Sequence, residues 1–599
     1  MDFTRLFDTL SYQLAKYPQQ VSMAHHLHDK DWAQLSTTDC YQICQSWSHV
    51  LLASGCKAGD RVLIFCEFGT AFWMLADIAI LQIGCVSVPI YPTVRDNELD
   101  YILTETCATA VIVGNVALFE KIKLAITKKP CQVFGWERIA GVVALPLKDI
   151  PLLDEAQKAQ LSAQRNAINE HDVATIVYTS GTTSDPKGVV LSHRNIVSNI
   201  KACIIMIPIH QGHRALSALP LSHIFERMVV YAYVAVGASI YFVPAVNSLE
   251  LVRQVRPHYM TAVPKLLERF YTAILAKADR SGWFARKTVR WAVGLGKRFS
   301  SHIDFNFTYL MQLWLADILV FRLWRGALGG KLRGIMVGAA ALPPELGRLF
   351  SAARIAIREG YGLSETSPVV AFNRFEPGGN RFGTVGMPIP GVEIRIVARN
   401  DDGAGEIQVK GPNVMRGYYQ NAELTAQVLS TDGWFTTGDI GKMVHGRFLK
   451  ITGRSKEIFK TLHGRYVSPT QIEQHIEASE YVEQCMVVGA NKTAILALIV
   501  PNFQALEQWC RTHKIHWTAP QFMVVNTKVE QFMASIVLEY NKTLQSHERV
   551  RKWILLHEPW TIESGELTPT LKIKRNVIET RWQKHIEEQY TEDETDRRE

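Results

Sequence analysis

The sequence lacks the cysteine patterns of a disulfide-rich or metal-bound protein. Its 599 residues include ten cysteines, but no two are spaced as Cys-x-x-Cys, and the closest pair is Cys40 and Cys44. We therefore expect reduced thiols in a cytoplasmic protein. The first twenty residues have no basic segment followed by an apolar core, so we expect no secretory signal.

Long hydrophobic runs and a strong charge of one sign are also missing. The longest apolar run, MVVYAYVAVGASIYFVP (228–244), is shorter than a usual membrane span and is interrupted by Gly237 and Ser239. It predicts a buried helix followed by a strand, and we predict no transmembrane segment. The net charge of +8 is too small to indicate nucleic acid as a partner. The length predicts several domains.

Short apolar runs rich in β-forming residues alternate with helical patterns through the first two-thirds of the chain. This alternation predicts α/β layers with largely parallel strands. From about Gly383 the pattern changes to short strands joined by tight turns, which predicts a small β subdomain. The expected buried strands are 61–66, 108–113, 174–179, 239–243 and 334–338.

A second change of pattern follows residues 437–441 and predicts an independent α+β unit. We place the boundary near Arg454, between a large domain of the α/β class and a smaller C-terminal domain. Ser468, with Pro469 and Gln471 after it, predicts a helix start with a capping box. The predicted units are an N-terminal domain (1–453), a mobile C-terminal domain (454–590) and a charged, disordered tail (591–599).

Residues 178–193, YTSGTTSDPKGVVLSH, have the composition of a phosphate-binding loop. They are not a Walker A motif, because the lysine precedes Gly188. Gly181 would let the backbone approach an anion, and Lys187 would supply positive charge. An ordinary polar loop between two strands fits the composition equally well. The hydroxyl donors of this loop are Thr179, Ser180, Thr182 and Thr183.

This loop resembles the AMP-binding signature of the adenylate-forming superfamily, which includes acyl-CoA synthetases, peptide-synthetase adenylation domains and luciferases. Four further stretches are similar to motifs of that superfamily, in the same order along the chain. The resemblance covers nearly the whole sequence and implies that the phosphates are those of ATP. The four stretches are YGLSETSPVV (361–370), GWFTTGDIG (433–441), ITGRSKEIFKTLHGRYVSPTQIE (451–473) and LTPTLKIKR (567–575).

The resemblance implies a carboxylate that attacks the α-phosphate of MgATP and forms an acyl-adenylate and pyrophosphate. Lys187 would cover the leaving pyrophosphate, and Lys572 would bridge the carboxylate and the α-phosphate. Glu365 and Thr182 would be ligands of Mg²⁺. The other implied ATP or AMP contacts are Thr179, Ser180, Gly181, Thr183, Ala339, Gly360, Tyr361, Gly362, Ser364, Asp439 and Arg454.

Three of these contacts have specific implied roles. Tyr361 would stack on adenine, with Gly360 and Gly362 allowing close approach, and Asp439 would accept hydrogen bonds from both ribose hydroxyls. Arg454 would add a ribose or phosphate contact. Taken singly, Tyr361 fits a core aromatic, Asp439 a turn cap and Lys572 a solvated charge. The ordered set of motifs favours the functional roles of Asp439, Glu365 and Lys572, whereas Arg454 also fits a basic residue that only pairs across the domains.

The same resemblance implies a hinge at Lys456. Rotation of the C-terminal domain would withdraw Lys572 and bring Gly464 and Arg465 to the channel for the pantetheine arm of CoA. Gly464 also suits a strand that passes close to a ligand.

Within the superfamily, residues 219–231 and 263–271 are similar to the long-chain acyl-CoA synthetases, as is the aromatic-rich stretch between Trp283 and Trp324. His223 is expected near the acyl carboxylate or in a structural role. The implied co-substrates are a fatty acid, ATP and CoA, with Mg²⁺. The implied assembly is a homodimer.

Residues 284–299 predict a basic amphipathic helix. Its cations fall within an arc of about 120°, which suits an anionic membrane on its inner, cytoplasmic face. The alternative is a helix packed on its own domain with a solvated basic face. The cations are Arg286, Lys287, Arg290, Lys297 and Arg298.

Two positions depart from the superfamily pattern: Ser184 replaces a usual glycine, and GAAAL (338–342) is a looser match to an adenine-side motif. Neither removes a charged catalytic group. The leading hypothesis is therefore a long-chain fatty acid–CoA ligase. The alternatives are an acyl-AMP ligase that loads a carrier protein and a non-catalytic lipid-binding relative.

Overall fold

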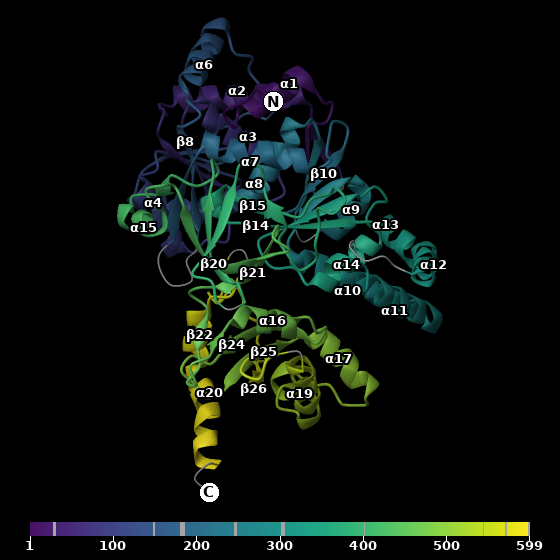
Figure 1. The fold of residues 1–599 in the computed structure, drawn as a ribbon. Helices are drawn as coiled ribbons and strands as arrows, with labels where there is room; N and C mark the ends of the chain where they lie inside the picture. Colours follow the sequence, from purple (N-terminus) through teal and green to yellow (C-terminus); the bar gives the residue numbers. More distant parts are fainter. Residues whose placement is uncertain are drawn as a thin grey trace.

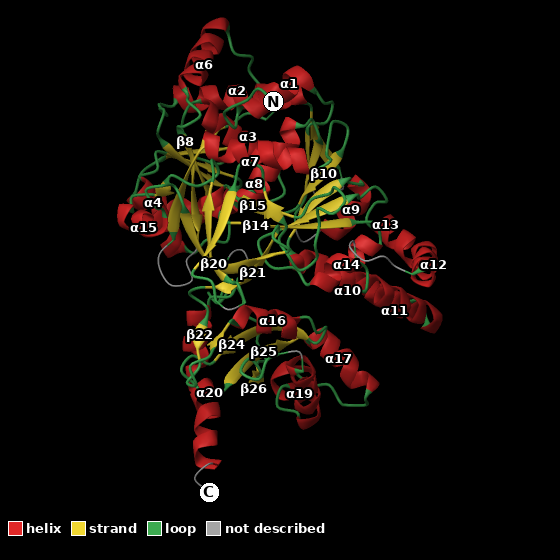
Figure 2. Cartoon of the chain, in the orientation of Figure 1, coloured by secondary structure: helices red, strands yellow, loops and turns green. Residues whose placement is uncertain are grey.

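Two large β-sheets form the N-terminal body of the protein (Figures 1 and 2). A computed structural model describes residues 1–27, 31–147, 150–179, 186–244, 248–300, 306–400, 402–542, 544–568 and 572–596. The first sheet is parallel at its centre and antiparallel where β8, β9 and β19 pair. In spatial order its strands are β19 (Gly417–Tyr418), β9 (Lys187–Ser192), β8 (Val173–Thr179), β4 (Val86–Ile90), β3 (Arg61–Phe65), β5 (Ala110–Val113), β6 (Gln132–Gly135) and β7 (Val143–Ala144).

The second sheet is also mainly parallel, with antiparallel pairs at both edges. The α/β prediction is therefore confirmed, and each of the five expected buried strands is present in one of the two sheets. In spatial order the strands of the second sheet are β16 (Met387–Pro388), β15 (Val369–Phe372), β14 (Ala356–Gly362), β13 (Gly334–Val337), β12 (Tyr259–Ala262), β10 (Arg214–Ser217), β11 (Ser239–Phe242), β1 (Met23–His26) and β2 (Trp32–Leu35).

Helices fill the space between the two sheets and cover their outer faces (Figure 2). Helix α8 (Ile224–Ala235) is buried along almost its whole length and leads into β11, as predicted for residues 228–244. The other helices of the body are α1 (Asp8–Lys16), α2 (Thr37–Ala53), α3 (Ala71–Gln82), α4 (Asp96–Thr106), α5 (Val116–Lys128), α6 (Glu155–Ala167), α7 (His193–Met206), α9 (Ser248–Val255), α10 (Pro264–Arg280), α14 (Pro344–Ala352) and α15 (Ala422–Val428), with the 3₁₀ turn η3 (Ser364–Thr366).

An apolar helical segment projects from the side of the body (Figure 1). It comprises α11 (Trp283–Lys297), α12 (Phe307–Ala316), the π-helical turn η2 (Asp317–Phe321) and α13 (Arg322–Ala327). Residues 307–327 are long and apolar enough to cross a membrane by length and composition alone, and only 22% of the most apolar window is buried. These residues lie largely within the aromatic-rich stretch between Trp283 and Trp324, for which no transmembrane segment was predicted.

The predicted β subdomain is a four-stranded antiparallel sheet. Its strands, in spatial order, are β17 (Glu393–Val397), β18 (Gly405–Lys410), β20 (Phe435–Val444) and β21 (Phe448–Arg454). Strand β21 leads into the C-terminal domain, which lies below the body in Figure 1.

The C-terminal domain has hydrophobic cores of its own on both faces of a three-stranded sheet. Its elements are β22 (Phe459–Lys460), β23 (Tyr466–Val467), α16 (Pro469–Glu477), β24 (Val482–Val488), β25 (Ile495–Pro501), α17 (Phe503–Thr512), α18 (Pro520–Met523), α19 (Thr527–Asn541), β26 (Val550–Leu555) and α20 (Arg575–Asp596).

Two expectations about this domain were wrong. Ser468 is the N-cap of α16, but it caps no backbone N–H. Instead, the Ser468 hydroxyl and the Gln471 amide both donate to the carbonyl of Thr452 at 2.8 Å, so a tertiary acceptor replaces the predicted capping box. Residues 591–596 continue α20, although their charge favoured disorder; 597–599 lie outside the described residues.

Candidate functional site

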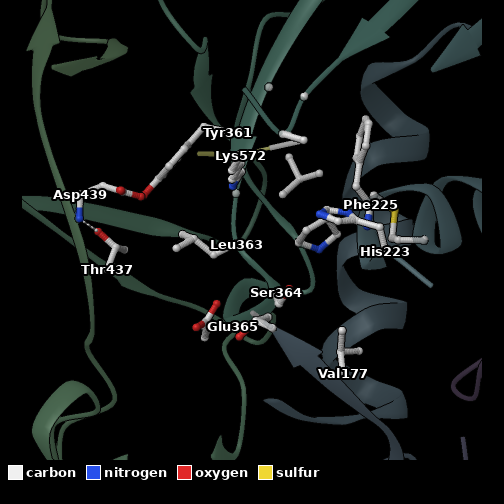
Figure 3. A pocket seen from close by; sticks show the side chains of 18 of the residues that line it. Val177, His223, Phe225, Tyr361, Leu363, Ser364, Glu365, Thr437, Asp439 and Lys572 are labelled. Atoms are coloured by element: carbon white, nitrogen blue, oxygen red, sulfur yellow. Dashed lines mark hydrogen bonds between the residues drawn. The ribbon is translucent and has the colours of Figure 1, made fainter. Parts of the chain in front are cut away.

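A pocket of about 560 Å³ lies where the body, the β subdomain and the C-terminal domain meet. Most of the described residues that the sequence predicted as site residues line it, although they come from distant parts of the chain (Figure 3). These residues are Thr179, Lys187, His223, Ala339, Gly360, Tyr361, Gly362, Ser364, Glu365, Asp439, Arg454, Lys456 and Lys572.

One corner of the pocket is built around the carboxylate of Asp439. The antiparallel register of β20 and β21 places Asp439 opposite Arg454, and Arg454 Nε lies 3.0 Å from Asp439 Oδ1. The Tyr361 hydroxyl donates to Asp439 Oδ2 at 2.7 Å, and the Asp439 N–H donates to Thr437 Oγ1 at 3.1 Å (Figure 3). Because a carboxylate has about four acceptor positions, Asp439 retains capacity for two more donors.

The position of Tyr361 follows from that hydrogen bond. Burial, followed by the charge of Asp439, raises the pKa of the Tyr361 hydroxyl well above its usual value, so the hydroxyl stays protonated and keeps donating. The ring is thereby held along the pocket wall. This orientation suits a flat ligand that stacks on the ring while its hydroxyls reach Asp439.

A second corner joins Glu365 and Lys187 through Tyr418. The Tyr418 hydroxyl donates to Glu365 Oε1 at 2.9 Å, and Lys187 Nζ lies 5.8 Å from the centre of the Tyr418 ring. Strand β19 brings Tyr418 here because it pairs with β9, opposite Val189. The sequence analysis missed Tyr418, since no motif contains it and only strand pairing places it in the site.

The glycines of this region allow neighbouring segments of the protein to pack closely together. A Cβ on Gly362 would lie 1.9 Å from the carbonyl oxygen of Pro368, and one on Gly360 would lie 3.0 Å from the Phe372 ring. The close approach that the sequence predicted for these glycines is therefore an approach to β15 and the turn before it. Ala339 has a positive φ of 70°, an uncommon conformation for a residue with a Cβ.

His223 is the N-cap of α8, and its Nδ1 accepts a hydrogen bond from the Phe225 N–H at 3.2 Å. That bond fixes the tautomer in which the other ring nitrogen, Nε2, carries the proton. Burial and the nearby charge of Lys572 lower the pKa of His223 to about 4. The neutral ring therefore presents an N–H donor near Lys572.

Lys572 reaches the pocket from the C-terminal domain (Figure 3). Its backbone N–H donates to Thr568 Oγ1 at 3.0 Å, and the Thr568 N–H donates back to the Lys572 carbonyl at 2.8 Å. Burial, followed by the charge of Arg454, lowers the pKa of the ammonium group, while Asp439, Glu457 and Glu365 oppose that change. A desolvated cation here would stabilise an anion strongly.

An apolar arm extends from His223 between α7 and α8. The described side chains that line it are uncharged, in contrast to the corners described above, so the arm suits a hydrocarbon chain. The described residues that line it include Cys203, Ile204, Ile207, Ile209, Met228, Val229, Ala232 and Tyr233.

Some predicted site residues lie elsewhere. Gly464 and Arg465 are exposed in the turn between β22 and β23, and neither lines the pocket. Gly464 has a φ of 78°, so it serves a left-handed turn and not a strand as predicted. The loop residues Ser180, Gly181, Thr182, Thr183 and Ser184 lie outside the described residues.

The described residues contain no cluster of three histidine, cysteine, aspartate or glutamate side chains that would hold a metal ion alone. Glu365 supplies one carboxylate at the corner shared with Lys187 and Tyr418. Such a site suits Mg²⁺, which is commonly held by one or two carboxylates together with substrate phosphates.

Comparison with known proteins agrees with this geometry. Residues 10–419 match the family described as AMP-binding enzyme, and residues 457–594 match the AMP-binding enzyme C-terminal domain. The chain belongs to the AMP-binding enzyme family. The predicted resemblance is thus confirmed, and the C-terminal unit is a separate domain of AMP-binding enzymes.

Relatives within the AMP-binding enzyme family include two named ligases. The chain is 32% identical over 589 residues to the long-chain-fatty-acid–CoA ligase FadD15 of Mycobacterium bovis, covering 95% of this chain and 94% of that protein. It is 27% identical over 639 residues to the chloroplastic long-chain-fatty-acid–[acyl-carrier-protein] ligase AEE15 of Arabidopsis thaliana, covering 96% and 85%.

The solved adenylation domain of a carboxylate reductase from Mycobacterium chelonae has the same fold as this AMP-binding enzyme. The TM-score is 0.76 at 20% identity, covering 98% of this chain and 91% of that chain. At this identity the likeness concerns the fold.

Proposed function

We propose that the protein activates a long-chain fatty acid to its acyl-CoA through an acyl-adenylate, with release of pyrophosphate and AMP. One observation carries the proposal: a single pocket joins the polar corners around Asp439 and Glu365 to an uncharged arm, with His223 and Lys572 near the arm's mouth. That order of surfaces matches a nucleotide, a carboxylate and a hydrocarbon chain laid end to end.

In the first step a carboxylate oxygen of the fatty acid attacks the α-phosphorus of ATP. The bond to the bridging oxygen breaks, and the pyrophosphate leaves with the electron pair. Lys572 supplies positive charge between the two reacting anions, and the Nε2–H of His223 donates to the acyl carboxylate. Lys187 stabilises the leaving pyrophosphate. Asp439 and Tyr361 hold the ribose and adenine throughout.

Mg²⁺ would be held by Glu365 and by the phosphates, and it would supply charge neutralisation at the phosphate oxygens. The Tyr418 hydroxyl fixes the orientation of the Glu365 carboxylate for this role. Thr182 remains a predicted second ligand.

In the second step the thiol of CoA loses its proton to water, and its sulfur attacks the carbonyl carbon of the acyl-adenylate. The thioester forms, the acyl–phosphate bond breaks and AMP leaves. The hinge role of Lys456 is supported by its exposed position in the turn after β21. Rotation there would withdraw Lys572 and bring Gly464 and Arg465 toward the pocket. The proposed division at residues 453 and 454 is supported by the separate cores of the C-terminal domain.

A second candidate differs in the acceptor: the adenylate is passed to a carrier protein instead of CoA. The name of the Arabidopsis relative supports this candidate. A non-catalytic lipid-binding role is disfavoured because Lys187, Glu365, Asp439 and Lys572 all line one pocket.

The deciding experiment measures AMP release over fatty acids of increasing chain length, with free CoA, with a phosphopantetheinylated carrier protein, and with neither. We expect long-chain acids and CoA to give rapid release and thioester. Thioester on the carrier alone would establish the second candidate. Absence of both AMP release and pyrophosphate exchange with every acid would overturn the proposal.

We further propose a cytoplasmic enzyme that acts as a peripheral membrane protein. Seven basic residues against two acidic residues between Trp283 and Ala327 support contact with an anionic surface. The homodimer remains a prediction.

A further inference from the structure

Eleven large hydrophobic side chains on the outer side of α11, α12, η2 and α13 are exposed to solvent. We call this set the apolar outer face. Phe307 is 75% exposed and Leu323 is 69% exposed, values that a core helix does not show. Large apolar side chains exposed in such number on neighbouring helices mark an interaction site. The members are Trp283, Phe284, Trp291, Phe307, Leu310, Met311, Trp314, Leu315, Ile318, Leu319 and Leu323.

The same helices have a second apolar side that packs on the body. Ala316, Val320, Phe321 and Trp324 are buried in a cluster that also contains Leu349 of α14. Because this inner side is in use, residues 307–327 cannot cross a bilayer without unpacking the body. The geometry therefore favours a helix that lies along a surface, with its outer face available.

Exposed cations lie on the same helices as the apolar outer face. Arg286, Lys287, Arg290, Arg298 and Arg322 are exposed, and no ion pair with another described residue involves them. Two neighbouring cations are already paired, Lys297 with Glu345 at 2.9 Å and Arg325 with Asp317. The cations free of such pairs thus lie along the N-terminal half of α11, at its end and beside Leu323.

We propose that the apolar outer face docks on an anionic lipid bilayer. The side chains of α12, η2 and α13 enter the boundary between headgroups and acyl chains, and the cations contact lipid phosphates. An interfacial helix with an apolar side and a basic rim binds membranes in this way. This inference deepens the proposed function, since it places the enzyme where long-chain fatty acids partition.

Charge selects the bilayer over a second copy of the chain. Packing two copies face to face would bring two rows of cations together, and like charges at an interface are repulsive. An anionic lipid surface neutralises the same cations. It also accepts apolar side chains from several helices without shape complementarity.

The test is flotation of the full-length protein with vesicles of phosphatidylcholine, with and without phosphatidylglycerol. The apolar variant combines Phe307→Ser, Trp314→Ser and Leu323→Ser. We expect it to partition at least tenfold more weakly than wild type, since three large side chains no longer enter lipid. The matched control combines Leu124→Ser, Leu152→Ser and Val525→Ser, three side chains at least 72% exposed elsewhere; it should partition as wild type does.

A charge variant combines Arg286→Gln, Lys287→Gln and Arg290→Gln. We expect it to lose about 100-fold in binding to anionic vesicles at low salt and little of the binding that persists at high salt. No flotation of wild type with anionic vesicles would overturn the inference, as would equal binding of the apolar variant and its control.

A different overturning result is a wild-type dimer that the apolar variant converts to monomer, with no vesicle binding by either. That outcome would assign the face to a second copy. AMP release with detergent-dispersed fatty acid and no vesicles separates this inference from the proposed function. If wild type floats but releases no AMP, the proposed function is refuted and the proposed membrane surface is not.

Discussion

The two walls of the pocket are held in different ways. On the body side, Asp439 is fixed by an ion pair, a tyrosine hydroxyl and its own strand register, and Glu365 is fixed by Tyr418. On the C-terminal side, Lys572 is held by two hydrogen bonds with Thr568, next to the bridge between Leu567 and Ile573. One side is held by a sheet, and the other by a few local contacts.

An ion pair between Lys574 Nζ and Glu98 Oε1, at 3.8 Å, joins the C-terminal domain to the body two residues after Lys572. Both side chains are largely buried at this contact, 9% and 13% exposed. The difference teaches that the nucleotide wall is assembled by the body and the β subdomain, with Arg454 at the domain boundary, whereas the proposed catalytic lysine is brought in by domain docking. Changes on the C-terminal wall should therefore affect adenylate formation alone, whereas changes on the nucleotide wall should affect both half-reactions.

The largest expected effect is that of Lys572→Ala. Adenylate formation should fall about 100- to 1000-fold, because a desolvated cation at the reacting oxygens is lost. Conversion of supplied acyl-adenylate to acyl-CoA should continue nearly unchanged. Pyrophosphate exchange and thioester formation, measured separately, check this.

The control for that variant is Lys584→Ala, which removes an exposed lysine of α20. It should leave both steps at the wild-type rate. Equal loss of both steps in Lys572→Ala would break the distinction between the two walls.

Asp439→Asn should have the next largest effect. Charge-assisted hydrogen bonds of this kind contribute about 1.5–3 kcal/mol, so kcat/KM for ATP should fall about 10- to 100-fold. Because the body wall holds the nucleotide in both steps, the reaction of acyl-adenylate with CoA should fall as well. The matched control is Asp402→Asn, which breaks an exposed pair with Lys442 in the same subdomain. Loss confined to one step would contradict the proposed role.

Local motifs made the nucleotide wall predictable. Tyr361, Glu365, Asp439 and Lys572 lie within short patterns, and the structure gathers all four at one pocket. Tyr418 was not predictable, because it enters through the pairing of β19 with β9. The pair of Glu98 and Lys574 was not predictable either, because it forms only when two domains dock.

Two apolar stretches show where composition alone fails. Residues 228–244 form the longest apolar run and were correctly predicted to be buried. Residues 307–327 were not predicted to form a long apolar helix, because Gln312, Asp317 and Arg322 interrupt the run. Helical geometry nevertheless places their apolar residues on two sides, one buried and one exposed. Which side is covered depends on α14, which is distant in the sequence.

Glu98→Gln tests the docking of the C-terminal wall, and it should lower the rate of adenylate formation less than the two substitutions above. It removes the interdomain ion pair, so docking of Lys572 should weaken and adenylate formation should fall up to about fivefold. The thioester step should be unaffected. Asp100→Asn, on the same helix, breaks only an exposed pair with Lys128 and should change neither step.

A double variant with Lys574→Gln completes the test. If the two residues act as a pair, the second substitution should add little to the first. Additive losses would show that Glu98 acts independently of Lys574.

The smallest expected effect concerns pH. With a pKa of about 4, His223 is neutral from pH 5 to 8 and should produce no inflection in the rate of adenylate formation there. The lowered pKa of Lys572 acts at the alkaline end: its cation is present below that pKa and lost as pH rises through it, at lower pH than for an ordinary lysine. The rate of adenylate formation measured against pH, for wild type and His223→Gln, checks both expectations. An inflection near pH 6.5 that disappears in His223→Gln would contradict the assigned tautomer.

The carbonyl of Thr452 has a bearing on how catalysis begins. Ser468 and Gln471 both donate to it from beyond the proposed hinge, and Gly453 allows the approach, since a Cβ there would lie 2.5 Å from the Ser468 hydroxyl. Turning about Lys456 would detach both donors at once. These two bonds therefore favour the orientation that we propose for adenylate formation, so that ATP and the fatty acid would meet a protein already arranged for the first reaction.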